Sequence, residues 1–380
     1  INFKSHELLS AKPFISKFGF KPFAGYTDYD WEMAFTVLKT VSKFITQTEK
    51  YSLCGWIDDN RCFLYGSYKV TRERASPIES TLVQQPTILS EFNCKFLTDL
   101  LPNISKDPFY GYILFNNFLL SLIKERFYIT VRFCPSYSLV IIGITGTGKT
   151  SSATPMLNPI SLQSCCFEDS MAAIRRTFQG NNNGCTIVDD FKCNSRSNIE
   201  KFEEIVRLSG DNTSNGKRVS GQKVDNPVVT GMAAFTGEEI PHLQASSFPR
   251  LLIVEVEPDM INFNVLTTLT ENIGKYNAFA IEFLRHIMSI DNFDNEFVAK
   301  VKSYRDGLRM DPATKGMHGR YFDSFGWLAT MWDYFHEFCS HYERVIEYDF
   351  KKELKSRIIK QWGRFDTDPV KMFARAFALL

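Results

Sequence analysis

The sequence predicts an α/β fold: a parallel sheet with flanking helices, preceded by a small N-terminal β-containing module and followed by a helical C-terminal region. Three observations carry this prediction. Between about residues 137 and 257, short apolar runs alternate with polar segments that suit helices. A glycine-rich run at 143–150 directly follows one of the apolar runs. From residue 262 onward, apolar residues recur at helical spacing.

The bulk composition is that of a folded protein with more than one part. The chain has 380 residues, more than a single hydrophobic core usually organises. Its 44% hydrophobic and 23% charged residues argue against disorder as the overall state. We expect an N-terminal α+β module at 1–85, a helical lead-in at 86–135, an α/β core at 136–258 and a C-terminal helical domain at 259–380.

Charge and cysteine usage limit the class of partner. The formal net charge is +1, so a contact with nucleic acid requires a local basic patch. The nine cysteines show no paired spacing of a metal site, and we expect a reduced, cytoplasmic compartment. Charged residues interrupt the longest apolar stretch, 112–131, which predicts a buried helix and no membrane partner. The chain begins at Ile1 without a signal-peptide pattern, and we expect it to be a piece of a longer protein.

Each region has its own pattern of elements. In the N-terminal module, residues 55–65 predict two short strands around an Asp-Asn turn. Beyond the turn signals that end this module, residues 88–101 and 110–127 predict helices. In the core, strands are predicted at 137–142, 185–188, 228–235 and 251–256, and a helix at 198–208. Further helices are predicted at 276–290, 322–342 and 350–362.

The run from Gly143 to Thr150 reads G-I-T-G-T-G-K-T and fits the phosphate-binding pattern G-x-x-x-x-G-K-[ST]. Its glycines let backbone N–H groups converge on phosphate oxygens, and the helix that begins near Thr150 adds its positive end. Lys149 is expected to reach the β- and γ-phosphates. The predicted ligands are ATP and Mg²⁺, with GTP left open. The residues expected to bind the nucleotide are Gly143, Thr145, Gly146, Thr147, Gly148, Lys149, Thr150 and Ser151.

A short apolar strand ending in two carboxylates follows the loop. We expect Thr150 and Asp189 to hold Mg²⁺, because the metal of such sites is completed by an acidic residue at the end of a nearby strand. Asp190 would then orient or deprotonate the attacking water, although the two roles could be reversed. On the next core strand, Thr236 is the expected polar sensor of the γ-phosphate and Glu238 the second choice. A plain strand-to-loop turn is the alternative there.

This order of motifs resembles the AAA+ ATPases, whose P-loop core also arranges a phosphate loop, an acidic strand, a sensor strand, an arginine finger and a helical lid. More narrowly, it resembles the superfamily 3-like helicase domains of bacterial mobile-element and phage primase-helicases, over about residues 50–380. The resemblance is carried by Gly55-Trp56, the phosphate loop, 187–190, 236–238, 246–250, His318-Gly319-Arg320, 368–370 and Phe373. It implies an AAA+-like core with a C-terminal helical lid.

The resemblance also implies roles for two arginines. Arg250 stands immediately before an apolar strand and would act as a finger in the site of a neighbouring copy in a ring, a hexamer. Arg320 would sense the γ-phosphate from the lid. The alternatives are a surface arginine and a salt-bridged helix arginine. One residue departs from the family pattern, since many members have glutamate where this sequence has the shorter Asp190.

A polar segment at 207–223 contains an Asn-Gly turn signal and predicts an exposed hairpin. In the resembled ring helicases such a hairpin projects into the central pore. Lys217, Arg218 and Lys223 would then grip the backbone of single-stranded or forked DNA. A solvated basic loop without a partner is the alternative.

The sequence therefore favours an ATP-driven DNA helicase or translocase of a mobile genetic element or phage, acting in DNA replication and hydrolysing ATP at the subunit interfaces of a ring. The second reading is a nucleotide-dependent assembly switch or defence ATPase that remodels protein partners. A small-molecule kinase shares the phosphate loop but fits the long helical region poorly.

Overall fold

A computed structural model describes residues 54–57, 60–78, 87–192, 194–212, 229–239, 243 and 246–365. The chain divides into two units, residues 1–51 and 52–380, and every described residue belongs to the second. The predicted hairpin residues Lys217, Arg218 and Lys223 lie outside the described residues, as do 368–370 and Phe373.

Within the described part of the chain, the larger sheet has five strands, all parallel, in the spatial order β6-β7-β8-β5-β9. These strands are β5 (Ser138–Ile142), β6 (Cys165–Cys166), β7 (Cys185–Phe191), β8 (Met232–Gly237) and β9 (Leu251–Glu255). Helices cover both faces, which explains why the strands read as nearly continuous apolar runs. The strand that carries Thr236 lies between the strand before the phosphate loop and the acidic strand. The predicted fold class is confirmed.

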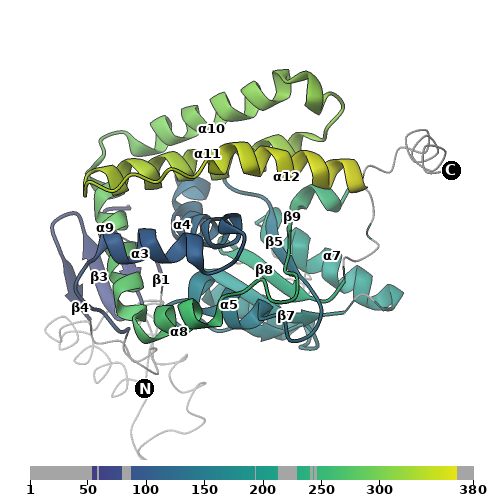
Figure 1. Cartoon of the computed structure of the whole chain (residues 1–380), viewed down its shortest axis with the longest axis horizontal. Coiled ribbons are helices and arrows are strands. Elements are labelled where there is room, and N and C mark those ends of the chain that lie inside the picture. Colours follow the sequence, from purple (N-terminus) through teal and green to yellow (C-terminus); the bar gives the residue numbers. More distant parts are fainter. Residues whose placement is uncertain are drawn as a thin grey trace, which may run out of the picture. The chain divides into compact units, whose positions relative to one another are not determined.

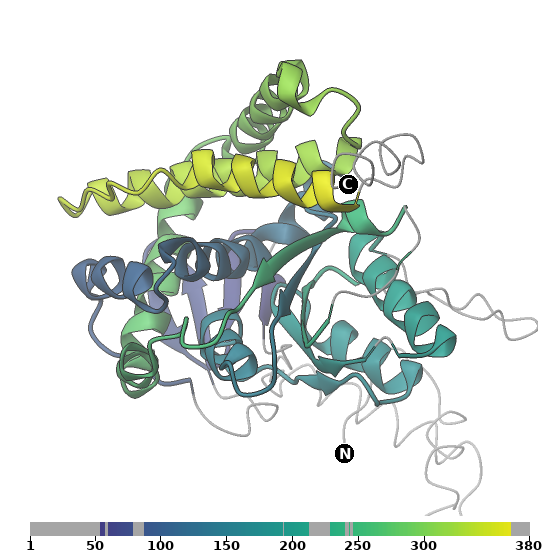
Figure 2. The same cartoon turned by 45° about the vertical axis from the view of Figure 1, so that its right-hand side comes forward.

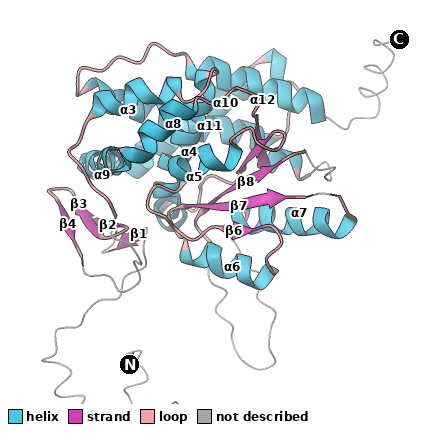
Figure 3. Cartoon of the chain, turned by 60° about the horizontal axis from the view of Figure 1, so that its bottom comes forward, coloured by secondary structure: helices cyan, strands magenta, loops and turns pink. Residues whose placement is uncertain are grey.

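Alternate side chains of β5, β7, β8 and β9 enter two separate hydrophobic cores. In β5, Leu139 and Ile141 pack with α4 (Pro108–Thr130) and α5 (Lys149–Leu157), whereas Val140 and Ile142 belong to the opposite core. That second core is completed by α6 (Met171–Gly180) and α7 (Arg196–Gly210), which lie beside β6 and β7 in Figure 3. The sheet is thus the middle layer of three.

The helical C-terminal region packs mainly on α4. Its elements are α8 (Phe263–Glu271), α9 (Ile273–Ser289), α10 (Phe293–Met310), α11 (Gly319–Ser340) and α12 (Phe350–Phe365). Figures 1 and 2 show α11 and α12 next to α4, and edge-to-face rings such as Tyr112 with Trp332 join α4 to α11. Most of α4 is buried, as predicted for residues 112–131. Within the described ranges, no helix has both the length and the apolar character that a membrane span requires.

A small antiparallel sheet precedes these helices in the chain. It runs through β1 (Cys54–Ile57), β2 (Cys62–Tyr65), β3 (Tyr68–Thr71) and β4 (Ala75–Pro77), in that order. The two predicted strands are β1 and β2, whereas β3 and β4 were not predicted. Trp56 Nε1 donates to the Leu122 carbonyl oxygen at 2.9 Å, and Tyr65 Oη donates to Asn277 Oδ1 at 2.8 Å. These contacts join the sheet to α4 and α9. A helix α3 (Cys94–Leu100) follows it, shorter than the predicted 88–101.

A buried lysine ties the far ends of two core elements together. Lys124 of α4 has no exposed surface, and its Nζ donates to the carbonyl oxygens of Ser209 at 2.8 Å and Gly231 at 3.1 Å. Burial lowers the pKa of Lys124 to about 8. The end of α7 and the residue before β8 are thereby held side by side at the amino edge of the sheet.

Candidate nucleotide-binding site

The phosphate loop connects the carboxyl end of β5 to the first residue of α5, and its shape requires glycine. A Cβ added to Gly143 would lie 2.3 Å from the carbonyl oxygen of Val256. Gly148 has a φ of +85°, and a Cβ there would meet the Phe263 ring at 2.9 Å. The first N–H groups of a helix have no partner within the helix, so the start of α5 can bind an anion.

The Lys149 side chain lies over this loop. Its Nζ donates hydrogen bonds to the carbonyl oxygens of Gly143 at 2.6 Å and Ile144 at 2.8 Å. Both acceptors are neutral, and an ionised phosphate is a stronger acceptor for an ammonium group. Lys149 can therefore exchange these carbonyls for a phosphate bound at the same loop.

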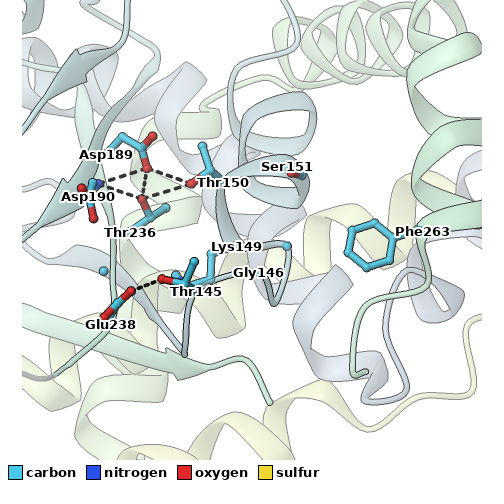
Figure 4. Close-up of a pocket in the computed structure, with 12 residues that line it drawn as sticks. Thr145, Gly146, Lys149, Thr150, Ser151, Asp189, Asp190, Thr236, Glu238 and Phe263 are labelled. Carbon is cyan, nitrogen blue, oxygen red and sulfur yellow. Dashed lines mark hydrogen bonds between the residues drawn. The ribbon is translucent and has the colours of Figure 1, made fainter. Parts of the chain in front are cut away.

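Three side-chain oxygens from three elements converge beside Lys149 (Figure 4). Thr150 Oγ1 donates to Asp189 Oδ1 at 2.8 Å, and Thr236 Oγ1 donates to the same carboxylate oxygen. The two hydroxyl oxygens are 3.5 Å apart. Thr236 is almost fully buried, because β8 lies between β5 and β7. The predicted Thr150, Asp189 and Thr236 are thus brought together by the strand order.

The oxygen cluster suits a magnesium ion that is shared with a phosphate. Hydroxyl and carboxylate oxygens are the donors that Mg²⁺ prefers, and it commonly takes only one or two protein ligands beside waters and phosphates. Among the described residues, no group of three or more His, Cys, Asp and Glu side chains could hold a metal by itself. Thr150 and Asp189 supply two such donors, and a bound nucleotide would add phosphate oxygens.

Asp190 takes a different direction from its neighbour. Its φ is +55°, and the register of β7 against β8 shifts between Val188 and Phe191, so Asp190 stands in a bulge. Its carboxylate pairs with Lys192 at 3.2 Å, and this contact raises the pKa of Lys192. The bulge turns Asp190 toward solvent at the edge of the cavity. Lys192 was not among the predicted residues.

These side chains line a cavity of about 500 Å³ at the carboxyl edge of the sheet, a size that suits a nucleotide. On one wall, Glu238 accepts a hydrogen bond from Thr145 of the loop. On the opposite side stands Phe263, the first residue of α8, with 51% of its surface exposed (Figure 4). The lining residues are Thr145, Gly146, Gly148, Lys149, Thr150, Ser151, Asp189, Asp190, Thr236, Gly237, Glu238 and Phe263. Among the predicted loop residues, Gly143 and Thr147 do not line it.

Replacing Phe263 with alanine is expected to raise the KM for ATP about tenfold, with kcat changed less than about twofold. The exposed ring offers a flat apolar face beside the phosphate loop, and stacking of a base on such a face contributes about 1–3 kcal/mol. Steady-state hydrolysis over a range of ATP concentrations measures both constants. Phe263→Tyr keeps the ring and should behave as wild type. An unchanged KM in Phe263→Ala would place the base elsewhere.

The two predicted arginines lie away from this cavity. Arg250 directly precedes β9, and Leu251 pairs in parallel register with Ser138 at the amino end of β5. The phosphate loop follows the carboxyl end of the same β5. Five strand residues separate the two edges, about 17 Å at 3.3 Å per residue. Arg250 therefore cannot reach the phosphate loop of its own chain.

Arg320 lies beside Arg250. Arg250 Nη2 is 3.6 Å and Arg320 Nη2 is 3.8 Å from the same oxygen, Asp211 Oδ1, at the end of α7. Arg320 is the second residue of α11, where His318 caps the helix by accepting from the Arg320 N–H at 3.2 Å. Both arginines thus belong to one cluster at the amino edge of the sheet.

Comparison with known proteins adds a likeness in fold. No family model and no curated protein matches the sequence. A solved structure described as SCCmec type IV Cch, active helicase, matches with a TM-score of 0.56 and 11% identity, over 94% of this chain and 67% of that chain. JCV helicase has a TM-score of 0.33 at 12% identity, over 63% of this chain and 65% of its own. The NrS-1 C-terminal region has 0.34 at 12%, over 79% and 80%.

The similarity in fold rests on the first of these structures, because TM-scores near 0.3 are too low to support a similarity in fold. At 11% identity it shows the fold alone. The chain therefore has a helicase-like α/β fold.

Proposed function

We propose that the chain is an ATP-driven DNA helicase or translocase of a mobile genetic element or phage that acts in DNA replication. One observation carries the proposal: a single sheet presents two half-sites at opposite edges. The phosphate loop, Thr150 and Asp189 occupy the carboxyl edge, and Arg250 occupies the amino edge. Among the described residues that line the cavity, Lys149 is the single cation and no arginine is present, so an arginine from a second copy can complete the site.

At the carboxyl edge, the residues of one chain bind and orient ATP. Lys149 leaves the carbonyl oxygens of Gly143 and Ile144 and binds the β- and γ-phosphates. Thr150 and Asp189 would hold Mg²⁺, which would neutralise part of the phosphate charge. Thr236 stays hydrogen-bonded to Asp189 and keeps that carboxylate in one orientation.

Asp190 activates the water that attacks the γ-phosphorus. Its carboxylate, exposed at the cavity edge, exchanges Lys192 for the water and accepts a proton from it. The oxygen of the water bonds to phosphorus as the bond to the leaving ADP oxygen breaks. The Asp190 side chain is one methylene shorter than that of glutamate. The bulge compensates for this difference in length, because it directs Asp190 outward from β7.

At the amino edge, Arg250 serves the cavity of a neighbouring copy. The carboxyl edge of one copy would contact the amino edge of the next copy, which is a head-to-tail contact. Such contacts close into a ring when the rotation between neighbouring copies allows it. A hexamer is the ring that we propose. Hydrolysis would then depend on assembly, because each complete site takes residues from two copies.

DNA stimulation of hydrolysis tests this function. We expect single-stranded DNA to raise the hydrolysis rate of the wild type, and Lys217→Ala with Arg218→Ala to lose that stimulation while keeping the rate without DNA. Removal of two phosphate contacts per chain should also flatten the salt dependence of DNA binding. Steady-state hydrolysis with and without DNA at several salt concentrations measures both effects.

The matched control changes a basic pair elsewhere. Arg72 and Arg74 are exposed beside the small sheet, and Arg72→Ala with Arg74→Ala should leave the stimulation intact. If hydrolysis ignores DNA in every variant, the motor function is excluded. A protein-remodelling ATPase would then take its place.

A further inference from the structure

One carboxylate stands between the two arginines of the amino edge. Asp211 follows the last residue of α7, and its Oδ1 lies 3.6 Å from Arg250 Nη2 and 3.8 Å from Arg320 Nη2. The three residues come from the end of α7, the turn before β9 and the start of α11. The tertiary fold alone therefore creates this arrangement.

Two arginines share Asp211 in this cluster, and Asp323 is a second carboxylate that acts on Arg320. The Arg250 side chain is 12% exposed and the Arg320 side chain 30%, so solvent screens their mutual repulsion only in part. Burial, and then the charge of Arg250, lowers the pKa of Arg320. Burial and both arginines also lower the pKa of His318. The two arginines therefore repel each other, and an anion that contacts both of them reduces this repulsion.

Asp211 holds the arginines by charge and without a hydrogen bond. Distances of 3.6 and 3.8 Å exceed those of guanidinium–carboxylate hydrogen bonds. Arg250 Nη1 donates to the Ser246 carbonyl oxygen at 2.8 Å, while its buried Nε has no partner among the described residues. Donor capacity therefore remains for a ligand with several oxygens, such as a phosphate.

We propose that Asp211 is an exchangeable counter-ion, which holds Arg250 and Arg320 together in the separate chain and releases both to a phosphate group bound by a second copy. The inference rests on the proposed function, because it takes the arginines to act on a neighbouring site. Asp211 touches no substrate and is a positioning residue. Its charge competes with the phosphate, so it weakens nucleotide-dependent assembly and keeps the arginine pair in place until a nucleotide is present.

Two substitutions with opposite expected effects test the role of Asp211. Asp211→Asn removes the competing charge, and the protein concentration for half-maximal assembly with a non-hydrolysable ATP analogue should fall about fivefold. Asp211→Glu adds one methylene, which can close the gap to the guanidinium groups, and should raise that concentration about threefold. Sedimentation velocity measures the assembly midpoint. The KM for ATP of each variant should move in the same direction, with kcat changed less than about twofold.

A charge-matched control lies on the same helix. Glu200 is exposed on α7 and pairs with Arg196, so Glu200→Gln removes one carboxylate without touching the cluster and should leave the midpoint unchanged. A purely structural role for Asp211 would make both of its variants assemble less well and melt at a lower temperature. That outcome overturns the proposal, as does an unchanged midpoint.

The remaining outcomes separate this inference from the function on which it rests. If Asp211→Asn does not fold, Asp211→Glu decides alone, and a midpoint that stays constant or falls overturns the proposal. If Lys149→Ala hydrolyses ATP like the wild type, or the wild type never assembles, the proposed function fails first. If hydrolysis and assembly stand and only the Asp211 shifts are missing, the counter-ion role alone is wrong.

Discussion

Lys149→Ala is expected to reduce ATP hydrolysis by at least about a hundredfold while the fold is kept. Removing a positioned donor that stabilises developing charge costs about 10²–10³ in rate, and the P-loop lysine also binds the substrate phosphates. The two hydrogen bonds that Lys149 loses go to loop carbonyls at the edge of an open cavity, where water can replace it. Phosphate release with saturating Mg²⁺ and ATP measures the rate, and circular dichroism with thermal melting checks the fold.

The control for this prediction is a lysine with no role in the cavity. Lys302 is exposed on α10, and Lys302→Ala should hydrolyse ATP at the wild-type rate. A contaminating ATPase is excluded if the activity co-elutes with the protein. If Lys149→Ala then retains most of the wild-type activity, the catalytic cavity must lie elsewhere in the chain.

The sequence predicted the parts of the site that are continuous in the chain. The phosphate loop is a local motif, and the strand ending at Asp189 is a short apolar run, so both were visible without the fold. Their meeting was also expected, since parallel strands end at one edge of the sheet. The structure brings Thr150, Asp189 and Thr236 together as that argument requires.

Features without a periodic pattern were missed. The strand β6 has only two residues, too short for any alternation. Phe263 is a single exposed aromatic residue, and its position beside Gly148 depends on the path of the chain after β9. Lys192 became relevant only when the bulge turned Asp190 away from the strand.

The arginine cluster is the clearest example of a feature that the sequence alone could not predict. Arg250 and Arg320 were singled out separately, each through a resemblance, and nothing in their spacing indicated that they share a partner. Asp211 was not singled out at all, because an isolated aspartate after a helix usually interacts with solvent or caps the next element. Only the packing of α11 against the amino edge of the sheet brings the three charges together.

Arg250→Ala is expected to lower ATP hydrolysis by roughly 10³-fold without weakening nucleotide binding by the same chain, because an arginine finger acts on the transition state of a neighbouring site. Binding of a fluorescent ATP analogue and steady-state hydrolysis measure the two effects. The wild-type cavity of each chain is intact in this variant, since Arg250 lies at the opposite edge of the sheet.

Mixing two inactive variants distinguishes action in a neighbouring copy from action within one chain. In an equal mixture of Arg250→Ala and Lys149→Ala, about a quarter of the head-to-tail interfaces join an intact phosphate loop to an intact arginine, and hydrolysis should return in that proportion. Subunits must be mixed below the assembly midpoint and then concentrated, so that the rings contain both variants. If each site were complete within one chain, every chain in the mixture would lack one essential residue and no activity could return. Recovery would therefore support the division of the site between two edges, whereas persistent inactivity of proven mixed rings would rule it out.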